Sequence, residues 1–394
     1  MHIKNIWKKG IAFGLSVVMA AGSVVPAQAA QVSDGSLKAA EEKAETVAMI
    51  AHYPLQSDTD DVSGNNKNAE IHGSVSWGDG LVLPGGKKTS AGDAAYVTLP
   101  EGLFDGKDEV TISAWIKSNT DKGNYSALFF GTKAQSNNMP LNYWLFNPTN
   151  PSGNFKSVFT NDNNSGAPYQ TEVGVNGSST TANKGVWTHY TTVLTGDSVT
   201  GYINGKKIGT TAKTKKTSDF GTGLQAYIGR SNYLSDTAYA GSFQDLRIYD
   251  DALDAQEVED VYLTTDSVND SVKTIVVDQI ADRLNLDAYL ENGILCKEGQ
   301  IELPEEFYGA DVTWTSDQPE VISATGKVTL PSEQTVVKLE AEVKLGTASA
   351  KRNFQITVLA KDGQIDYWKE HLQIPYVLDV KTVLPVTLGA VQVD

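Results

Sequence analysis

Short runs of apolar and β-branched residues recur between residues 47 and 263, and clusters of Gly, Asn, Asp and Ser separate them. The runs that best fit strands are 110–117, 127–131, 142–146, 155–159, 186–194, 199–203, 224–229 and 242–249. Asn204 and Gly205 both tolerate positive φ, so they predict a tight hairpin directly after the run 199–203. So many short strands with no long helices between them indicate an all-β sandwich.

A helix and a polar segment follow this sandwich. Residues 254–262 predict a helix, because Asp254 can cap its first turn and Glu257, three residues later, completes a capping box. Residues 264–274 are polar and carry no apolar pattern, so they predict a hinge.

The apolar pattern resumes after the hinge. Apolar positions in 275–290 recur at roughly helical spacing and predict a short helix. Short β-rich runs follow at 299–303, 312–316, 326–330, 336–344 and 350–358. Apolar and polar residues alternate along 336–344, as they do in a half-buried strand. Residues 275–360 therefore predict a second, smaller β-sandwich.

The two ends of the chain differ from both sandwiches. Three lysines within the first nine residues precede the apolar run 11–25 and then several small residues, which predicts a signal peptide over 1–30. The alternative is a buried N-terminal helix or an anchor. Residues 31–46 predict a flexible leader. The apolar end of 361–394 predicts a linker and the start of a downstream domain that is missing, so we expect a bacterial protein that is secreted to the extracellular space.

Charge and composition exclude several classes of function. The 394 residues include 48 acidic and 32 basic side chains, for a net charge of -16. Such a chain should bind nucleic acid poorly, because proteins that bind nucleic acid contact its phosphates through basic residues. No later stretch is apolar enough to insert into a membrane. One cysteine, Cys296, excludes an internal disulfide framework and a cysteine-based zinc site. We expect a monomer.

Seven short motifs occur in a specific order along the first sandwich. They begin at Asp61 (DVSGN), Tyr96 (YVTLP), Thr111 (TISAWI), Trp187 (WTHY), Tyr202 (YING), Tyr227 (YIG) and Gln244 (QDLRIYDDAL). In this order they resemble the laminin-G-like, concanavalin A-type jelly roll, over about residues 48–263. The resemblance implies a concanavalin A-like jelly-roll sandwich over 47–263.

Residues 269–359 resemble a second family, the atrophied bacterial immunoglobulin-like domain. The motifs that carry this resemblance are LP at Leu303, VTWTS at Val312, GKV at Gly326 and FQITV at Phe354. The second sandwich is therefore expected to be immunoglobulin-like. In that family, this pair of domains often precedes the catalytic domain of a glycoside hydrolase that degrades arabinan or xylan.

No catalytic constellation is evident in the chain. Jelly-roll glucanases carry a Glu-x-Asp-x-x-Glu strand, and the sequence has none. The acidic string 257–260 lies on a predicted surface helix, where acids are ordinarily solvated. Glycoside hydrolysis usually requires two carboxylates that flank the scissile bond, and no such pair stands out. No catalytic residue is assigned.

The jelly-roll resemblance also implies a structural calcium ion. Calcium prefers six to eight oxygen ligands from carboxylates and carbonyls. In the family, the metal lies between the Asp61 turn and the acid before the Arg-Ile-Tyr strand, which points to Asp61 and Asp245. The sequence departs from the family at Gln244, where a second acid is common. The alternative is that Asp61 only forms a turn by bonding to its own backbone.

Three aromatic residues are candidates for sugar binding. Proteins bind sugars with aromatic faces and planar polar groups on loops, and Trp144, Tyr169 and Tyr233 lie in or beside stretches rich in Asn and Ser. Because strand residues alternate between faces, either Tyr143 or Trp144 must point away from the core. Core packing is the alternative role for each of the three.

Together these observations predict secreted, non-catalytic modules that bind a polysaccharide of plant or other origin and act as a spacer. They would form the N-terminal part of a polysaccharide-degrading glycoside hydrolase of the arabinan or xylan type. The alternatives are an extracellular adhesion or surface protein and a purely structural spacer.

Overall fold

The computed structural model describes residues 48–363, except 121, 179–183 and 292. The predicted signal peptide, the leader and nearly all of 361–394 lie outside these residues. Within the described part, no helix is long and apolar enough to cross a membrane.

The chain forms two compact units. Among the described residues, the larger unit contains 48–283 together with 305–312 and 343–350, and the smaller contains the remainder from Leu284 onward. Each is described by itself.

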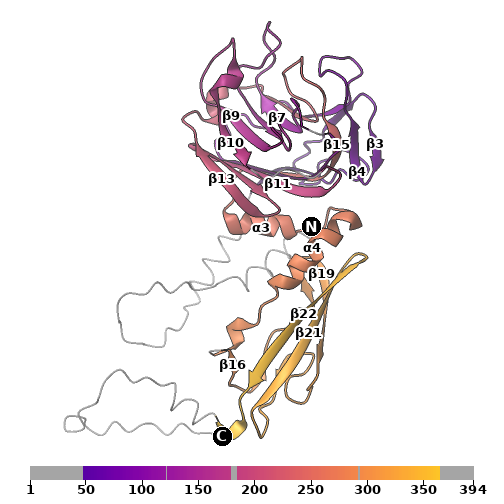
Figure 1. Cartoon of the computed structure of the whole chain (residues 1–394), viewed down its shortest axis with the longest axis vertical. Helices are drawn as coiled ribbons and strands as arrows, with labels where there is room; N and C mark the ends of the chain where they lie inside the picture. The colour runs from indigo at the N-terminus through magenta and orange to yellow at the C-terminus, as the bar shows by residue number, and fades with distance from the viewer. Residues whose placement is uncertain (1–47, 121, 179–183, 292, 364–394) are drawn as a thin grey trace, which may run out of the picture. The chain divides into compact units, whose positions relative to one another are not determined.

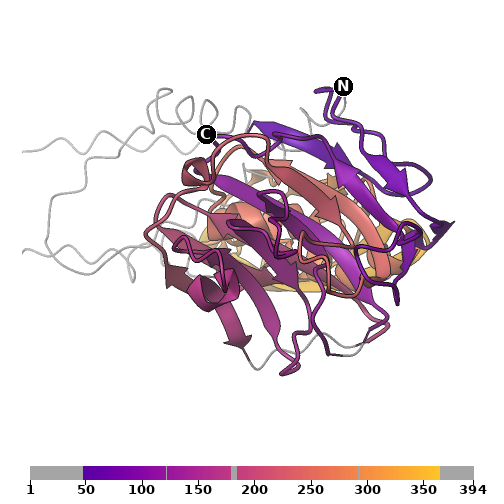
Figure 2. The ribbon, with the colours of Figure 1, turned by 90° about the horizontal axis from the view of Figure 1, so that it is seen from above.

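Two antiparallel sheets form the sandwich of the larger unit (Figure 1). Sheet A has the order β13 (Lys206–Ala212), β12 (Ser198–Ile203), β11 (Trp187–Leu194), β6 (Val110–Ser118), β15 (Ala240–Tyr249), β4 (Gly80–Pro84) and β3 (Ser76–Gly78), and β1 (Met49–Tyr53) also pairs with β15. Sheet B has the order β10 (Glu172–Ser178), β9 (Phe155–Thr160), β8 (Tyr143–Asn147), β7 (Leu128–Gly131), β14 (Gln225–Ile228), β5 (Tyr96–Leu99) and β2 (Glu70–His72). Figure 2 shows the strands of this sandwich from above. The predicted all-β fold is confirmed.

The core of the larger unit lies between the two sheets, and alternation along each strand selects the side chains that enter it. In β8, Trp144 and Phe146 point inward and join the main core. Tyr143 and Leu145 point to the opposite face of sheet B, where they join a second apolar cluster with Phe129. Tyr143 and Leu145 are buried there as well, and Tyr233 and Met139 from connecting loops join the same cluster.

Two elements form where their local residues predict them. The turn Asn204-Gly205 has φ of 49° and 74° and joins β12 to β13 as a hairpin. Helix α3 (Ala255–Leu263) begins after Asp254, whose side chain accepts hydrogen bonds from the backbone N–H of Gln256 and Glu257. The capping box with Glu257 is present as expected.

The segment that was predicted to be a hinge is bonded to sheet A. Asn269 Nδ2 and Ser271 Oγ donate to Oδ1 of Asp79 over 3.1 and 2.6 Å. The backbone N–H of Asn269 donates to Oε1 of Gln244 over 2.8 Å. Helix α4 (Asp270–Arg283) begins within this segment, earlier than the predicted 275–290. Residues 265–271 are therefore an ordered part of the larger unit.

Asp79 accepts two further hydrogen bonds on its other carboxylate oxygen. Trp187 Nε1 and Lys117 Nζ donate to Oδ2 over 2.7 and 3.0 Å. Burial alone would raise the pKa of Asp79, but the bonds from Ser271, Trp187, Asn269 and Lys117 hold it far below its ordinary value. Asp79 therefore stays ionised and ties the segment after α3 to the sandwich.

A five-stranded sheet forms the immunoglobulin-like part of the chain. Its order is β16 (Ile294–Leu295), β22 (Ala348–Val358), β21 (Thr335–Leu345), β19 (Ala310–Ser316) and β18 (Glu306–Phe307), and β17 (Gly299–Gln300) pairs separately with β20 (Lys327–Val328). Buried and exposed residues alternate along β21, as its sequence predicted. Trp314 is buried, and its Nε1 donates to the carbonyl oxygen of Pro304.

Candidate functional site

Asp61, the first predicted calcium ligand, forms a turn between β1 and β2. Its Oδ1 accepts the backbone N–H of His52 and of Ser63, and its Oδ2 accepts that of Lys67, each over 2.9 Å. Burial would raise the pKa of Asp61, but these hydrogen bonds outweigh it and lower the pKa. Asp61 thus has the turn-forming role that the sequence left as the alternative.

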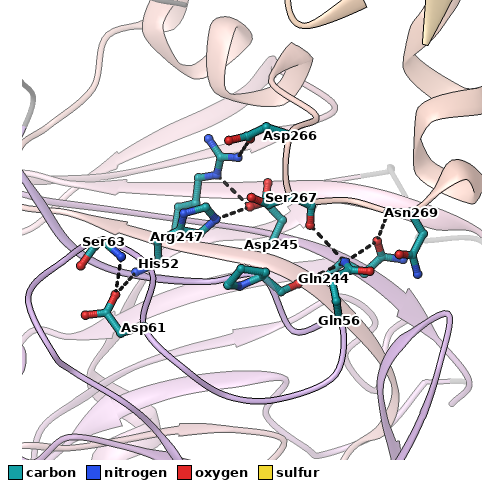
Figure 3. Close-up of polar contacts among 11 residues, drawn as sticks. His52, Gln56, Asp61, Ser63, Gln244, Asp245, Arg247, Asp266, Ser267 and Asn269 are labelled. Carbon is teal, nitrogen blue, oxygen red and sulfur yellow. Dashed lines mark hydrogen bonds and ion pairs between the residues drawn. The ribbon is translucent and has the colours of Figure 1, made fainter. Parts of the chain in front are cut away.

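Asp245, the second predicted ligand, lies at an irregularity in β15 where the pairing with β6 shifts. Its φ of 54° is in the left-handed region, which Asp tolerates better than most residues. The side chain is 1% exposed, and its Oδ1 accepts hydrogen bonds from His52 Nε2 over 2.7 Å and from Arg247 Nε over 2.9 Å (Figure 3). Arg247 extends this pairing, because its Nη2 donates to Asp266 over 2.7 Å.

This arrangement does not fit a calcium ion. Burial would raise the pKa of Asp245, but the Arg247 guanidinium and His52 hold it far below its ordinary value. The negative charge that would attract calcium is thus already balanced by a guanidinium, which would repel a cation. Asp61 bonds to the backbone of His52 and Asp245 to its ring, so His52 lies between the two carboxylates.

Gln244 is also engaged in other contacts. It bonds to Gln56 and Asp79 and accepts the N–H of Asn269. Among the residues that the structure describes, no group of three or more His, Cys, Asp or Glu side chains is placed to hold a metal ion. In this structure Asp61 forms a turn, and Asp245 belongs to a buried ion-pair network.

Of the three predicted sugar-binding aromatics, Trp144 lies in the core. Its side chain is 2% exposed, its ring stacks on Phe130 with centroids 5.6 Å apart, and its Nε1 donates to Ser157 Oγ over 3.0 Å. A ring that packs between the two sheets offers no face to a ligand from solution. This placement corrects the expectation for Trp144.

Tyr233 lies on the outer face of sheet B and is largely buried there. Its hydroxyl donates to the Tyr143 hydroxyl over 2.9 Å, and Tyr143 donates to Oε1 of Glu172 over 2.6 Å. Lys156 Nζ lies 2.6 Å from Oε2 of Glu172. Burial raises the pKa of Tyr233, and the nearby carboxylates of Glu172 and Asp236 raise it further. We call Tyr143, Lys156, Glu172, Tyr233 and Asp236 the Tyr233 cluster.

Tyr169 and Asp236 are the members of this region that remain available to a ligand. Tyr169 is 53% exposed, on the short helix η2 (Pro168–Thr171) directly before β10, which begins at Glu172. The Asp236 carboxylate forms no hydrogen bond or ion pair with any residue that the structure describes. Burial, and then the charge of Glu172, raise the pKa of Asp236 to about 6, although Lys156 acts in the opposite direction.

Sequence reasoning found the tyrosines but missed their polar partners. Glu172 and Lys156 lie on neighbouring strands, because Thr160 of β9 pairs with Glu172 of β10. Asp236 approaches them from a loop some sixty residues later. No local pattern marks these three residues, and only the strand order of sheet B brings them together.

Two family comparisons agree with this architecture. Residues 91–259 match the concanavalin A-like lectin/glucanases superfamily, and residues 295–361 match the atrophied bacterial Ig domain. No curated protein matches the chain.

Solved structures give more distant likenesses. Domain 4 of a GH43 extracellular arabinanase from Geobacillus stearothermophilus, in complex with arabinotriose, is 21% identical with a TM-score of 0.44, over 54% of this chain and 98% of that one. A mutant Trypanosoma rangeli sialidase displaying trans-sialidase activity is 10% identical with a TM-score of 0.40, over 56% and 33%. The binding domain of Paraclostridial Mosquitocidal Protein 1 is 15% identical with a TM-score of 0.34, over 75% and 63%. At these values they are likenesses of fold at most.

Proposed function

The chain carries a concanavalin A-like domain followed by an atrophied bacterial Ig domain, and we propose that the first of these binds carbohydrate. The observation that carries this proposal is the exposed ring of Tyr169 beside the polar Tyr233 cluster. We place the sugar against this part of sheet B.

The chemistry of the cluster suits a sugar. An exposed aromatic ring offers an apolar face for the C–H groups of a pyranose or furanose ring. The Asp236 carboxylate has free acceptor sites for sugar hydroxyls, and Lys156 supplies donors beside it. Glu172 and Tyr143 bond to each other and hold this surface in place.

The same geometry favours binding over hydrolysis. Glu172 and Asp236 are two carboxylates in one region, as a glycosidase requires. However, both oxygens of Glu172 are engaged, one by Tyr143 and one by Lys156. Tyr143 is fully buried, and its pKa is raised by that burial and by Glu172. Neither Glu172 nor Tyr143 is therefore poised to attack a sugar.

In the context of a whole protein, we propose that these modules hold a secreted glycoside hydrolase of the arabinan or xylan type near its polysaccharide, with the immunoglobulin-like part as a spacer. Residues 1–30 would direct secretion and be removed in the process. The mass of the protein recovered from a culture medium tests that cleavage.

Calorimetric titration with soluble arabinan and xylan tests the binding. For a shallow polar site we expect a Kd of about 1 mM, which is a binding free energy of ~4 kcal/mol in magnitude. We expect Tyr169→Ala to abolish measurable heat and Tyr169→Phe, which keeps the ring, to retain it. Val186→Ala, at an exposed apolar residue beside sheet A, is the matched control.

Three results would redirect the proposal. If no glycan binds to the wild type, an adhesion protein or a structural spacer is the better description. If Tyr169→Ala binds as the wild type does, the site lies elsewhere. If the chain releases sugars and an Asp236→Ala variant does not, the domain is an enzyme.

A further inference from the structure

At the opposite end of sheet B, an arginine is held over two aromatic rings. The Cζ atom of Arg230 lies 4.5 Å from the ring centroid of Tyr96 and 4.8 Å from that of Tyr227. His72 stacks on Tyr96, with centroids 4.6 Å apart and an interplanar angle of 16°. We call His72, Tyr96, Tyr227 and Arg230 the Arg230 stack. The guanidinium thus contacts two tyrosine rings, one from β5 and one from β14, which are nearly perpendicular to each other.

Among the described residues, the guanidinium of Arg230 has no carboxylate partner. Its Nε donates to the carbonyl oxygen of Ser231 over 3.3 Å, and Arg230 forms no ion pair with any described residue. By contrast, Arg247 and Arg283 each pair with two carboxylates. Among the acids of the neighbouring segments, Glu101 pairs with Lys133, and Glu70 Oε2 lies 3.9 Å from His72 Nε2. In a chain with a net charge of -16, an arginine without a carboxylate is a notable exception.

An immobilised guanidinium with free terminal N–H groups is suited to one class of ligand. Its planar fork matches the two oxygens of a carboxylate, which it can bind through two parallel hydrogen bonds. Contact with the Tyr96 and Tyr227 rings restrains the side chain before a ligand arrives, so binding costs less conformational entropy. The His72 ring, which stacks on Tyr96, is partly exposed.

We propose that the Arg230 stack binds the carboxylate of a sugar acid within an acidic polysaccharide. This choice of a sugar over an acidic peptide rests on the proposed function. The Arg230 stack and the Tyr233 cluster share one face, because Tyr227 and Tyr233 belong to the same apolar cluster. Five strand spacings separate β10 from β5, which is on the order of 24 Å. A polysaccharide of several units can therefore contact Tyr169 and Arg230 together.

The test compares one polymer in two charge states. Xylan that bears glucuronic acid is titrated beside the same xylan after its carboxyl groups are reduced to alcohols. We expect the wild type to bind the acidic polymer roughly tenfold more tightly, the size expected for hydrogen bonds to a charged group. Arg230→Gln should remove that preference, and Arg230→Lys, which keeps the charge but loses the fork, should remove most of it. Both variants should bind the reduced polymer as the wild type does.

Each outcome separates this inference from the proposed function. Equal binding of both polymers by the wild type overturns the inference and leaves the sugar site at Tyr169 intact. Binding of neither polymer overturns the proposed function. Competition by polyglutamate as effective as that by the acidic xylan overturns the choice of a sugar. If Arg230→Gln melts early, Arg230→Lys, which retains a cation over the rings, decides the result.

Discussion

The Nε2 atom of His52 lies 2.7 Å from Oδ1 of Asp245, and both side chains are almost fully buried. An ionised carboxylate only accepts hydrogen bonds, so Nε2 of His52 carries the proton of this bond. Together with Arg247, the histidine compensates the charge of Asp245 from within the chain. Side chains of the polypeptide thus provide hydrogen bonds and positive charge to Asp245 at the position where we expected a metal ion.

We therefore expect the melting temperature of the larger unit to be the same in calcium and in a chelator. A ligand that binds only the folded state raises the melting temperature by linkage, and the network around Asp245 leaves no oxygen set for the ion. Differential scanning calorimetry with calcium, magnesium and chelator checks this. A rise with calcium alone would show that Asp245 or Asp61 does hold the ion.

Asp245→Ala should lower the free energy of unfolding by about 3–5 kcal/mol, because it leaves the guanidinium of Arg247 buried with only Asp266 as a partner. The folded-state pKa of Asp245 lies below its ordinary 3.8, so its stabilisation is present above that pH and is lost as the pH falls below it. Urea unfolding at neutral and acidic pH measures both effects. Asp93→Ala, which removes an exposed ion pair with Lys87, is the control and should change little.

Asp236 should have the opposite effect on the pH dependence of stability. Its pKa rises from 3.8 to about 6 on folding, so the folded protein holds this proton to a higher pH than the unfolded chain does. Stability should consequently decrease as the pH rises from about 4 to about 6. Asp236→Asn removes this titration and should stabilise the protein at about pH 7.5 but not at about pH 4. An equal change at both pH values would contradict the assignment.

Removing the carboxylate of Asp79 should free the segment that precedes α4. Asp79→Ala deletes the acceptor of Asn269 and Ser271 and leaves Trp187 Nε1 without its partner. Hydrogen exchange over 265–271 should accelerate far more than exchange in β6 or β11. Exchange that stays at the wild-type rate in this segment would mean that its other contacts, with Gln56, Gln244 and Arg247, are sufficient to hold it.

The pattern of apolar and polar residues was sufficient to predict the sheets but insufficient to predict which aromatic residues form the candidate site. Alternation along 142–146 correctly requires Tyr143 and Trp144 to point to opposite faces, but it does not say which face is the core. Both faces of β8 are buried, so an aromatic residue on either side satisfies the same pattern. The decision depends on the loop that carries Tyr233, which no local signal connects to β8.

The predicted hinge shows the same limit at longer range. Residues 264–274 are polar, and polar segments without a pattern are ordinarily solvated connections. Here their polar groups bond to Asp79 and Gln244, which are 190 and 25 positions away from Asn269. The segment is polar, but its hydrogen-bond partners lie in distant parts of the chain, so its polarity alone could not show that it is ordered.

The pairing of β1 with β15 sets an order on biosynthesis. Met49 pairs with Tyr249, two hundred positions later in the chain, and β15 also pairs with β4 and β6. Strands β1, β4 and β6 are synthesised early, and each remains without its partner until β15 is synthesised. Contacts between such distant residues form slowly, and strands that wait unpaired can pair with other chains. A nascent chain that stalls before residue 249 would keep three strand edges open at once, so the yield of folded protein should depend on how quickly β15 is completed.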